Sequence, residues 1–159
     1  MDFMKQLTAL VARLLMSAIF LISGVNKIFH WQGTEKELIR VLSDWDSWVL
    51  STTAHITITQ MMAWSPVFLI LATLLELLGG LLLLFGARDK LGAFLLILFL
   101  IPATFLFHQF WFLEGNARDM QISFFLRNIA IMGGLMRVML NGIQGNKGRG
   151  NRFSSEQMQ

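Results

Sequence analysis

The sequence predicts an all-α membrane protein: a four-helix transmembrane bundle with an amphipathic helix in its long first extracytoplasmic loop. Of its 159 residues, 55% are hydrophobic and only 14% are charged, whereas a soluble domain carries about 25% charged residues. Four apolar stretches are each about long enough to cross a bilayer core as a helix, which takes roughly 20 residues. The predicted spans are residues 7–25, 67–85, 91–107 and 122–140, within one membrane domain of residues 1–140.

The first apolar stretch is predicted to be a retained membrane span rather than a cleaved signal peptide. A signal peptide has an apolar core of about 7–15 residues followed by a small-x-small cleavage site. Residues 7–25 are longer than that, and no such site follows before Lys27.

The first loop, residues 26–66, is the long one. Thr34-Glu35-Lys36-Glu37 has the form of a capping box, in which a threonine side chain and a glutamate satisfy each other's backbone amides at a helix start. Apolar residues then recur at helical spacing, which predicts an amphipathic helix over residues 35–50 with Trp45 and Trp48 at headgroup depth. The pattern of residues 52–64 leaves their secondary structure open.

Prolines and glycines predict where the second span begins and ends and where the third span bends. Ser65-Pro66 suits a helix start, because proline at the first helical position loses no needed hydrogen bond. Gly86 is expected to end the second span in the left-handed conformation, and Arg88-Asp89-Lys90 then forms a tight turn. Pro102 is expected to kink the third span.

Composition changes after the fourth span, and the basic residues indicate an orientation. Residues 141–159 are glycine-rich, basic and polar, which predicts a disordered basic tail. Lysines and arginines are more numerous on the side of the termini and the second loop than on the other side, so both termini are predicted to be cytoplasmic in a bacterial plasma (inner) membrane. The first group is Lys5, Arg88, Lys90, Lys147, Arg149 and Arg152; the second is Lys27, Lys36, Arg40 and Arg118.

Polar side chains interrupt the apolar spans and are the candidate site. A charge at a helix centre costs about 2.5–3.5 kcal/mol on insertion scales, so such residues mark functional sites by default. Helical depth predicts an ion pair between Arg13 and Glu76, since both point into the bundle from neighbouring spans. The remaining polar groups are expected to line a polar vestibule beneath the loop helix: Lys27, His108, Gln109, Arg127 and Asn128. The alternative is that the charges only fix helix register.

Several kinds of chemistry are excluded or disfavoured by the composition. The chain has no cysteine, which removes disulfides, thiolate nucleophiles and iron–sulfur ligation. Its histidines, His30, His55 and His108, include no pair at ligand spacing, so no metal site is predicted. The net charge is +3, but the basic residues are spread over loops and termini, and no nucleic-acid binding is expected.

The polar positions and nearby glycines resemble those of the DoxX family of small four-helix membrane proteins, over roughly residues 10–140. The residues that carry the resemblance are Arg13 with Gly24-Val25-Asn26-Lys27, Glu76 with Gly79-Gly80 and Gly86, His108 with Phe110-Trp111, and Arg127-Asn128-Ile129-Ala130 with Gly133-Gly134-Leu135. Family members more often carry lysine where Arg127 stands, so the positive charge is kept. The family is named after a subunit of an archaeal thiosulfate:quinone oxidoreductase, and other members are linked to redox assemblies.

The resemblance implies a quinone-linked or redox-associated accessory membrane subunit, with no metal and a redox protein as its partner. The ligand would be a quinone headgroup or another small polar-headed molecule, bound by Arg13, Lys27, Glu76, His108, Arg127 and Asn128. No residue is assigned a catalytic role, and any activity would be that of an oxidoreductase acting with its partner. The alternatives are a non-enzymatic assembly or scaffold protein and a small transporter, which would need to form a homo-oligomer.

Overall fold

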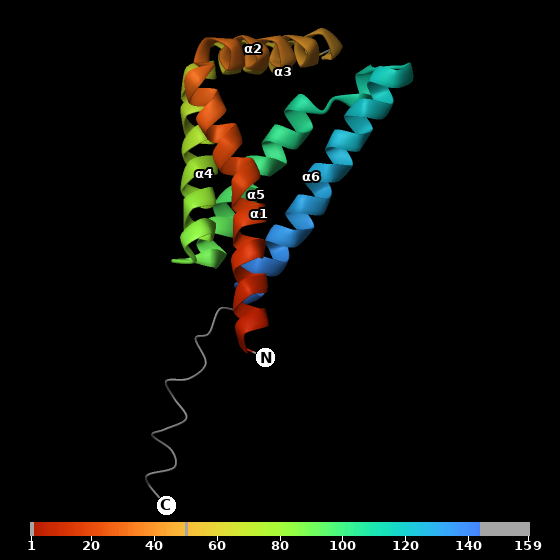
Figure 1. Cartoon of the computed structure of the whole chain (residues 1–159). Coiled ribbons are helices and arrows are strands. Elements are labelled where there is room, and N and C mark those ends of the chain that lie inside the picture. Colours follow the sequence, from red (N-terminus) through yellow and green to blue (C-terminus); the bar gives the residue numbers. More distant parts are fainter. Residues whose placement is uncertain (1, 50, 144–159) are drawn as a thin grey trace, which may run out of the picture.

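The computed structural model describes residues 2–49 and 51–143, and every regular element in that part of the chain is helical (Figure 1). The predicted disordered tail lies outside the described residues, apart from its first three positions. The elements are α1 (Asp2–Phe29), α2 (Trp31–Trp48), α3 (Thr52–Ala63), α4 (Ser65–Phe85), α5 (Asp89–Phe107), the short 3₁₀ helix η1 (Phe110–Phe112) and α6 (Gly115–Asn141).

Four of these helices, α1, α4, α5 and α6, are long and apolar enough to span a membrane, which confirms the predicted fold class. They extend beyond the apolar stretches that predicted them, since α1 begins at Asp2 and α6 already at Gly115. Hydropathy reports only the segment that matches the bilayer core, whereas a helix continues through polar flanks. We call the end of the bundle that carries α2 and α3 the hairpin end, and the opposite end, where α1 begins and α6 ends, the terminal end.

The four long helices form an open row rather than a closed bundle. α1 packs on α4, α4 on α5, and α5 on α6, but no Cα atom of α1 lies within 8 Å of a Cα atom of α6 among the described residues. Figure 1 shows the two outer helices close together at the terminal end and diverging toward the hairpin end. The interior is therefore filled at one end and widens at the other.

Glycines allow the close approach of neighbouring long helices, as their positions near the polar residues suggested. A Cβ atom on Gly24 of α1 would lie 2.6 Å from a Leu77 side-chain carbon of α4, and one on Gly80 would lie 2.9 Å from Leu21. Between α4 and α5, a Cβ atom on Gly79 would lie 2.7 Å from Leu96. Small residues of this kind let membrane helices pack backbone to backbone.

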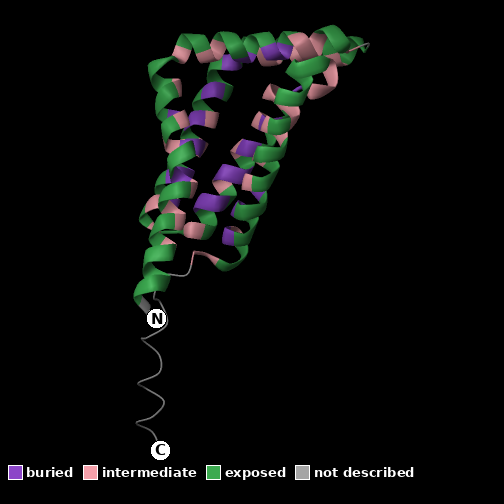
Figure 2. Cartoon of the chain, turned by 45° about the vertical axis from the view of Figure 1, so that its right-hand side comes forward, coloured by how far each residue is buried: buried purple, intermediate pink, exposed green. Residues whose placement is uncertain are grey.

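The packed core lies toward the terminal end. Figure 2 shows the buried residues on faces that point into the bundle, with exposed residues around the outside. The outer surface is apolar, as Leu15 and Ile22 illustrate with exposed fractions of 71% and 70%, and such a surface suits contact with acyl chains. The core cluster consists of Phe20, Leu83, Ala93, Leu96, Ile97, Leu100, Met132, Leu135 and Val138.

The loop helix is present but begins earlier than predicted, and the capping-box prediction is wrong. α2 begins at Trp31, so Thr34 lies inside the helix and its hydroxyl donates to the His30 carbonyl oxygen. Figure 1 shows α2 lying across the hairpin end of the long helices. The buried residues of α2, Leu38, Val41 and Leu42, face the bundle. The location of α2 at a membrane surface stays a prediction.

The rest of the long loop is also helical, and the predicted helix boundaries around α4 are confirmed. Of residues 52–64, which the sequence pattern left open, residues 52–63 form α3, which has no buried residue. α4 begins at Ser65 with Pro66 in its first turn, and Gly86 ends it at φ 65° in the left-handed region. α5 continues through Pro102 to Phe107 as one helix.

Candidate ligand-binding cavity

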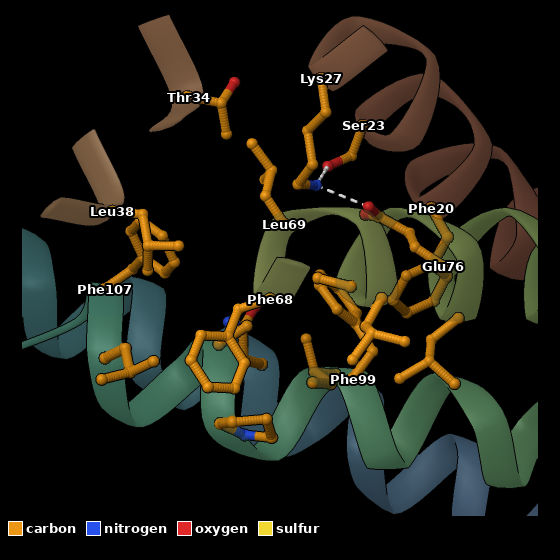
Figure 3. Close-up of a pocket in the computed structure, with 18 of the residues that line it drawn as sticks. Phe20, Ser23, Lys27, Thr34, Leu38, Phe68, Leu69, Glu76, Phe99 and Phe107 are labelled. Carbon is orange, nitrogen blue, oxygen red and sulfur yellow. Dashed lines mark hydrogen bonds and ion pairs between the residues drawn. The ribbon is translucent and has the colours of Figure 1, made fainter. Parts of the chain in front are cut away.

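A cavity of about 640 Å³ lies beneath α2, where α1 and α6 have diverged. Its walls come from all six α-helices and are mostly apolar. Leu38 and Leu42 of α2 form part of its roof, and Met61 is the contribution of α3. Figure 3 shows the aromatic side chains that gather around it: Phe20, Phe68, Phe99 and Phe107. The predicted vestibule is therefore present as a cavity, but its surface is apolar with a few polar groups rather than polar throughout.

One wall of the cavity carries a buried ion pair between α1 and α4. The Lys27 ammonium lies 2.5 Å from Glu76 Oε2 and also donates to Ser23 Oγ at 2.8 Å (Figure 3). The Glu76 side chain is 2% exposed and that of Lys27 is 17% exposed. The ammonium also lies 5.2 Å from the centre of the Phe99 ring, a distance at which a cation is attracted to the ring face. The pair thus presents a neutral, hydrogen-bonded group to the ligand space.

The predicted ion pair between Arg13 and Glu76 is wrong. α1 and α4 run antiparallel, and a Cβ atom on Gly24 would lie close to Leu77 and 3.6 Å from Glu76 Oε2. Arg13 instead packs against Gly86 at the end of α4, which is about 15 Å from Glu76 at roughly 1.5 Å per residue. The prediction counted depth from an assumed helix start at Leu7, whereas α1 begins at Asp2 and extends past the end of α4, so the two helices are offset.

Arg13 belongs to a hydrogen-bonded cluster at the terminal end, outside the cavity. Its guanidinium bonds both carboxylate oxygens of Asp89, at 2.5 and 2.9 Å, and donates to the carbonyl oxygens of Leu83 and Ile143. The Ile143 backbone amide in turn donates to Asp89 at 3.0 Å. This terminal clamp, consisting of Arg13, Asp89 and Ile143, joins α1, the start of α5 and the segment that follows α6.

The opposite wall of the cavity carries the polar residues of α5 and α6. His108, at the end of α5, lies with Nδ1 2.8 Å from Gln121 Oε1. Asn128 Nδ2 donates to Thr104 Oγ1 at 3.1 Å, which ties α6 to α5. Arg127 lines the same cavity, with its guanidinium carbon 4.8 Å from the centre of the Phe124 ring. The cavity therefore brings together the other five predicted site residues, namely Lys27, Glu76, His108, Arg127 and Asn128.

Gln109, which was expected in the vestibule, has a different position. It is buried, and its side-chain amide donates to the backbone carbonyl oxygens of Val41 and Leu106. It thereby joins α2 to the end of α5. At the other end of α2 the Ser65 hydroxyl donates to Glu35 at 3.3 Å, so both contacts hold α2 over the cavity.

Several partners in these networks were not predicted, among them Ser23, Asp89, Thr104 and Gln121. Ser23 lies one helical turn before Lys27, so its spacing could have suggested the hydrogen bond. Asp89 stands between two basic residues in a short turn, and this sequence context is typical of a solvent-exposed charged residue in a turn. Its pairing with Arg13 depends on how α1 packs beside α4, for which the local sequence gives no signal.

The arrangement is that of an integral membrane protein with a ligand-sized, largely apolar cavity inside its helix row. Among residues 2–49 and 51–143, no group of three or more histidine, aspartate or glutamate side chains is placed to hold a metal ion. The polar groups that remain are hydrogen-bond donors and acceptors: an ammonium–carboxylate pair, a guanidinium, an amide and an imidazole.

Comparison with known proteins identifies the family. The DoxX family model matches residues 8–109, and the chain belongs to the DoxX family. It is also similar to inner membrane protein YqjF of Escherichia coli (strain K12), with 28% identity over 139 residues and 87% of each chain covered. No solved structure matches the chain. The family match includes Lys27, Glu76 and His108, whereas Arg127 and Asn128 lie beyond it.

Proposed function

We propose that this protein is a multi-pass subunit of the bacterial inner membrane that binds a quinone in its cavity and serves a redox protein partner. The similarity to an inner membrane protein supports the location, and the basic residues support cytoplasmic termini. The single observation that carries the ligand proposal is the neutral Lys27–Glu76 pair in the wall of an otherwise apolar cavity.

The residues around the cavity suit a flat, polar-headed, lipid-soluble molecule. The rings of Phe68 and Phe99 offer apolar faces for stacking, and such faces favour aromatic partners. Lys27 and Arg127 supply hydrogen-bond donors for carbonyl oxygens. Glu76 and His108 are groups that accept and release protons, as reduction of a quinone to a quinol requires.

The shape of the helix row supports entry from the bilayer. Ile19 and Phe20 of α1 and Ile131 of α6 line the cavity on either side of the space where these helices diverge. An isoprenoid chain would lie along this gap and leave the headgroup inside. Entry from the membrane requires no route through water.

The test is thermal unfolding of the purified protein in a neutral detergent, with and without soluble ubiquinone and menaquinone analogues. A bound ligand stabilises the folded state by mass action, so the melting temperature should rise with ligand concentration. Glu76→Gln should abolish the rise, whereas Glu114→Gln, at an exposed position outside the cavity, should leave it unchanged. The absence of a shift with every quinone would overturn the proposal.

A second candidate function is that of a non-enzymatic assembly protein. The observation in its favour is α3, a helix with no buried residue, which leaves Ile56 52% exposed and available to a partner. In that case Glu76→Gln would lower stability, and recovery of a partner in a pull-down would remain unchanged at matched expression. The quinone proposal instead expects loss of ligand binding.

A further inference from the structure

Positive charge in the cavity is not balanced equally on its two walls. On the α1 and α4 wall, the Lys27 ammonium has the Glu76 carboxylate as its counter-ion and the Ser23 hydroxyl as a second acceptor. That wall is therefore neutral. The α6 wall carries Arg127, and its surroundings are different.

Within residues 2–49 and 51–143, Arg127 has no carboxylate within 4.0 Å and no hydrogen-bond acceptor. Its single described polar interaction is with the ring of Phe124. A guanidinium has five N–H donors and stays protonated in proteins. Arg127 therefore brings a full positive charge and a complete set of donors to the cavity.

The depth of Arg127 makes this arrangement costly without a counter-ion. It lies five residues inside the predicted span of residues 122–140, about 7.5 Å from the edge of that span at roughly 1.5 Å per residue. Cations inside a membrane span pair with an anion or with water, because the acyl chains offer neither a counter-charge nor a hydrogen-bond acceptor. An anion from outside the described part of the chain would supply this counter-charge.

The neighbours of Arg127 do not supply that anion. Asn128 is neutral and uses its amide nitrogen on Thr104, whose own hydroxyl donates to the Leu100 carbonyl oxygen at 2.6 Å. His108 is paired with the neutral amide of Gln121. Neither residue carries a negative charge, so the α6 wall as a whole is cationic.

We propose that the cavity binds an amphiphile whose head is an oxyanion, a carboxylate or a phosphate, paired with Arg127. The forked guanidinium matches the two oxygens of such a head and forms parallel hydrogen bonds with them. The apolar chain would lie against Phe68 and Phe99 and pass between α1 and α6. This proposal uses the same cavity as the proposed function and goes beyond it, because it assigns a second class of ligand that carries a negative charge.

The first experiment uses the wild-type protein in neutral detergent and compares charged probes with uncharged ones. Affinities are measured by native mass spectrometry for palmitic acid against methyl palmitate, and for lysophosphatidylglycerol against monopalmitoylglycerol, which has no phosphate. The acid of at least one pair should bind about tenfold or more tightly than its partner, as expected for hydrogen bonds between charged groups. The pair that shows the difference identifies a free fatty acid or a phospholipid as the source of the oxyanion.

Variants then locate the effect at Arg127. Arg127→Gln should remove the preference for the acid while keeping the affinity for methyl palmitate, and Arg127→Lys should keep part of it because the charge remains. Arg137→Gln, on the same helix but outside the cavity, is the matched control and should bind as wild type does.

Equal affinity for the charged and uncharged probe in both pairs would overturn the proposal without any variant. An unchanged preference in Arg127→Gln would overturn it as well. If Arg127→Gln does not fold, the acid preference of the wild-type protein and that of Arg127→Lys still test the proposal. Quinone-dependent melting shifts without an acid preference would reject this proposal alone, and the absence of both would reject the proposed function too.

Discussion

The two ends of the helix row use the same kind of interaction for different purposes. At the terminal end, Arg13 and Asp89 form a bidentate ion pair surrounded by backbone partners, and the core beside it is filled by apolar side chains. At the hairpin end, Lys27 and Glu76 form an ion pair beside an open cavity. The Arg13–Asp89 pair thus links three segments of the chain at the end where the helices converge. The Lys27–Glu76 pair is part of a candidate ligand site at the end where they diverge.

The difference comes from helix geometry. α1 and α6 come close together at the terminal end, where Arg13 of α1 donates to the Ile143 carbonyl oxygen just after α6, and they diverge at the hairpin end, where α2 lies across the row (Figure 1). An aromatic cluster supports the far end of α2, since Trp48 stacks on Phe112 at 4.6 Å and Trp45 packs against Trp111 at 5.6 Å.

The largest expected effect is from breaking the terminal clamp. Arg13→Gln leaves the Asp89 carboxylate with fewer partners in a mostly buried position, and removing one member of a buried pair typically costs about 3–5 kcal/mol. Thermal unfolding in detergent should show a large loss of stability, while the affinity for a cavity ligand in the folded fraction stays as in wild type. An unchanged melting temperature, or a loss of ligand affinity without a loss of stability, would contradict the assignment of a structural role to the terminal end and a ligand-binding role to the hairpin end.

The next largest effect is expected from the α4–α5 contact beneath the cavity. Gly79→Ala would place a methyl group 2.7 Å from Leu96 and 3.0 Å from the Gly92 carbonyl oxygen, and overpacking of this kind costs about 1–3 kcal/mol. Gly133→Ala is the matched control, because no atom lies within 4 Å of its added Cβ. Chemical or thermal unfolding should show a loss of stability for the first variant alone.

A labelling experiment compares the two ends directly, because the natural chain has no cysteine. Ser17→Cys lies in the packed part of α1, where the native residue is 0% exposed, and Ser23→Cys lines the cavity on the same helix. A maleimide should modify the cavity position about tenfold faster or more, since the packed position reacts only after local opening. Equal rates measured by mass spectrometry would mean that the cavity is no more accessible than the core.

The smallest effect is expected outside the helix row, in the ion pairs of α2. Arg40 bonds Glu37 and Asp44 on an exposed surface, where such pairs contribute about 0.2–1 kcal/mol. The hydrogen bond from Arg40 lowers the pKa of Glu37, so this contribution is present above the unfolded-state pKa and is lost as the pH falls through the lowered value. Arg40→Gln should slightly lower the melting temperature at neutral pH, and added salt should reduce the difference.

Several elements followed from local sequence alone. The four spans were predictable because a helix in a membrane must present about 20 apolar residues, whatever its neighbours are. Pro66 and Gly86 mark helix ends through their own backbone conformations, and the apolar spacing in α2 reports a helix with one buried face. The capping box failed because α2 begins at Trp31, before Thr34, so a local motif did not locate the helix start.

Most residues that line the candidate cavity were predictable, although Arg13 and Gln109 lie elsewhere, but the pairing of the charges was not. Helical spacing indicates which face a residue lies on, and it correctly directed Lys27, Glu76, Arg127 and Asn128 toward one interior. The partner of each charge depends on how far one helix is displaced along another, which is set by contacts such as Gly24 with Leu77 between distant segments. The sequence by itself therefore determined the helices and their polar faces. Only the tertiary structure decided that Glu76 meets Lys27, that Arg13 meets Asp89, and that a cavity remains between the diverging helices, because these outcomes depend on the relative positions of packed helices.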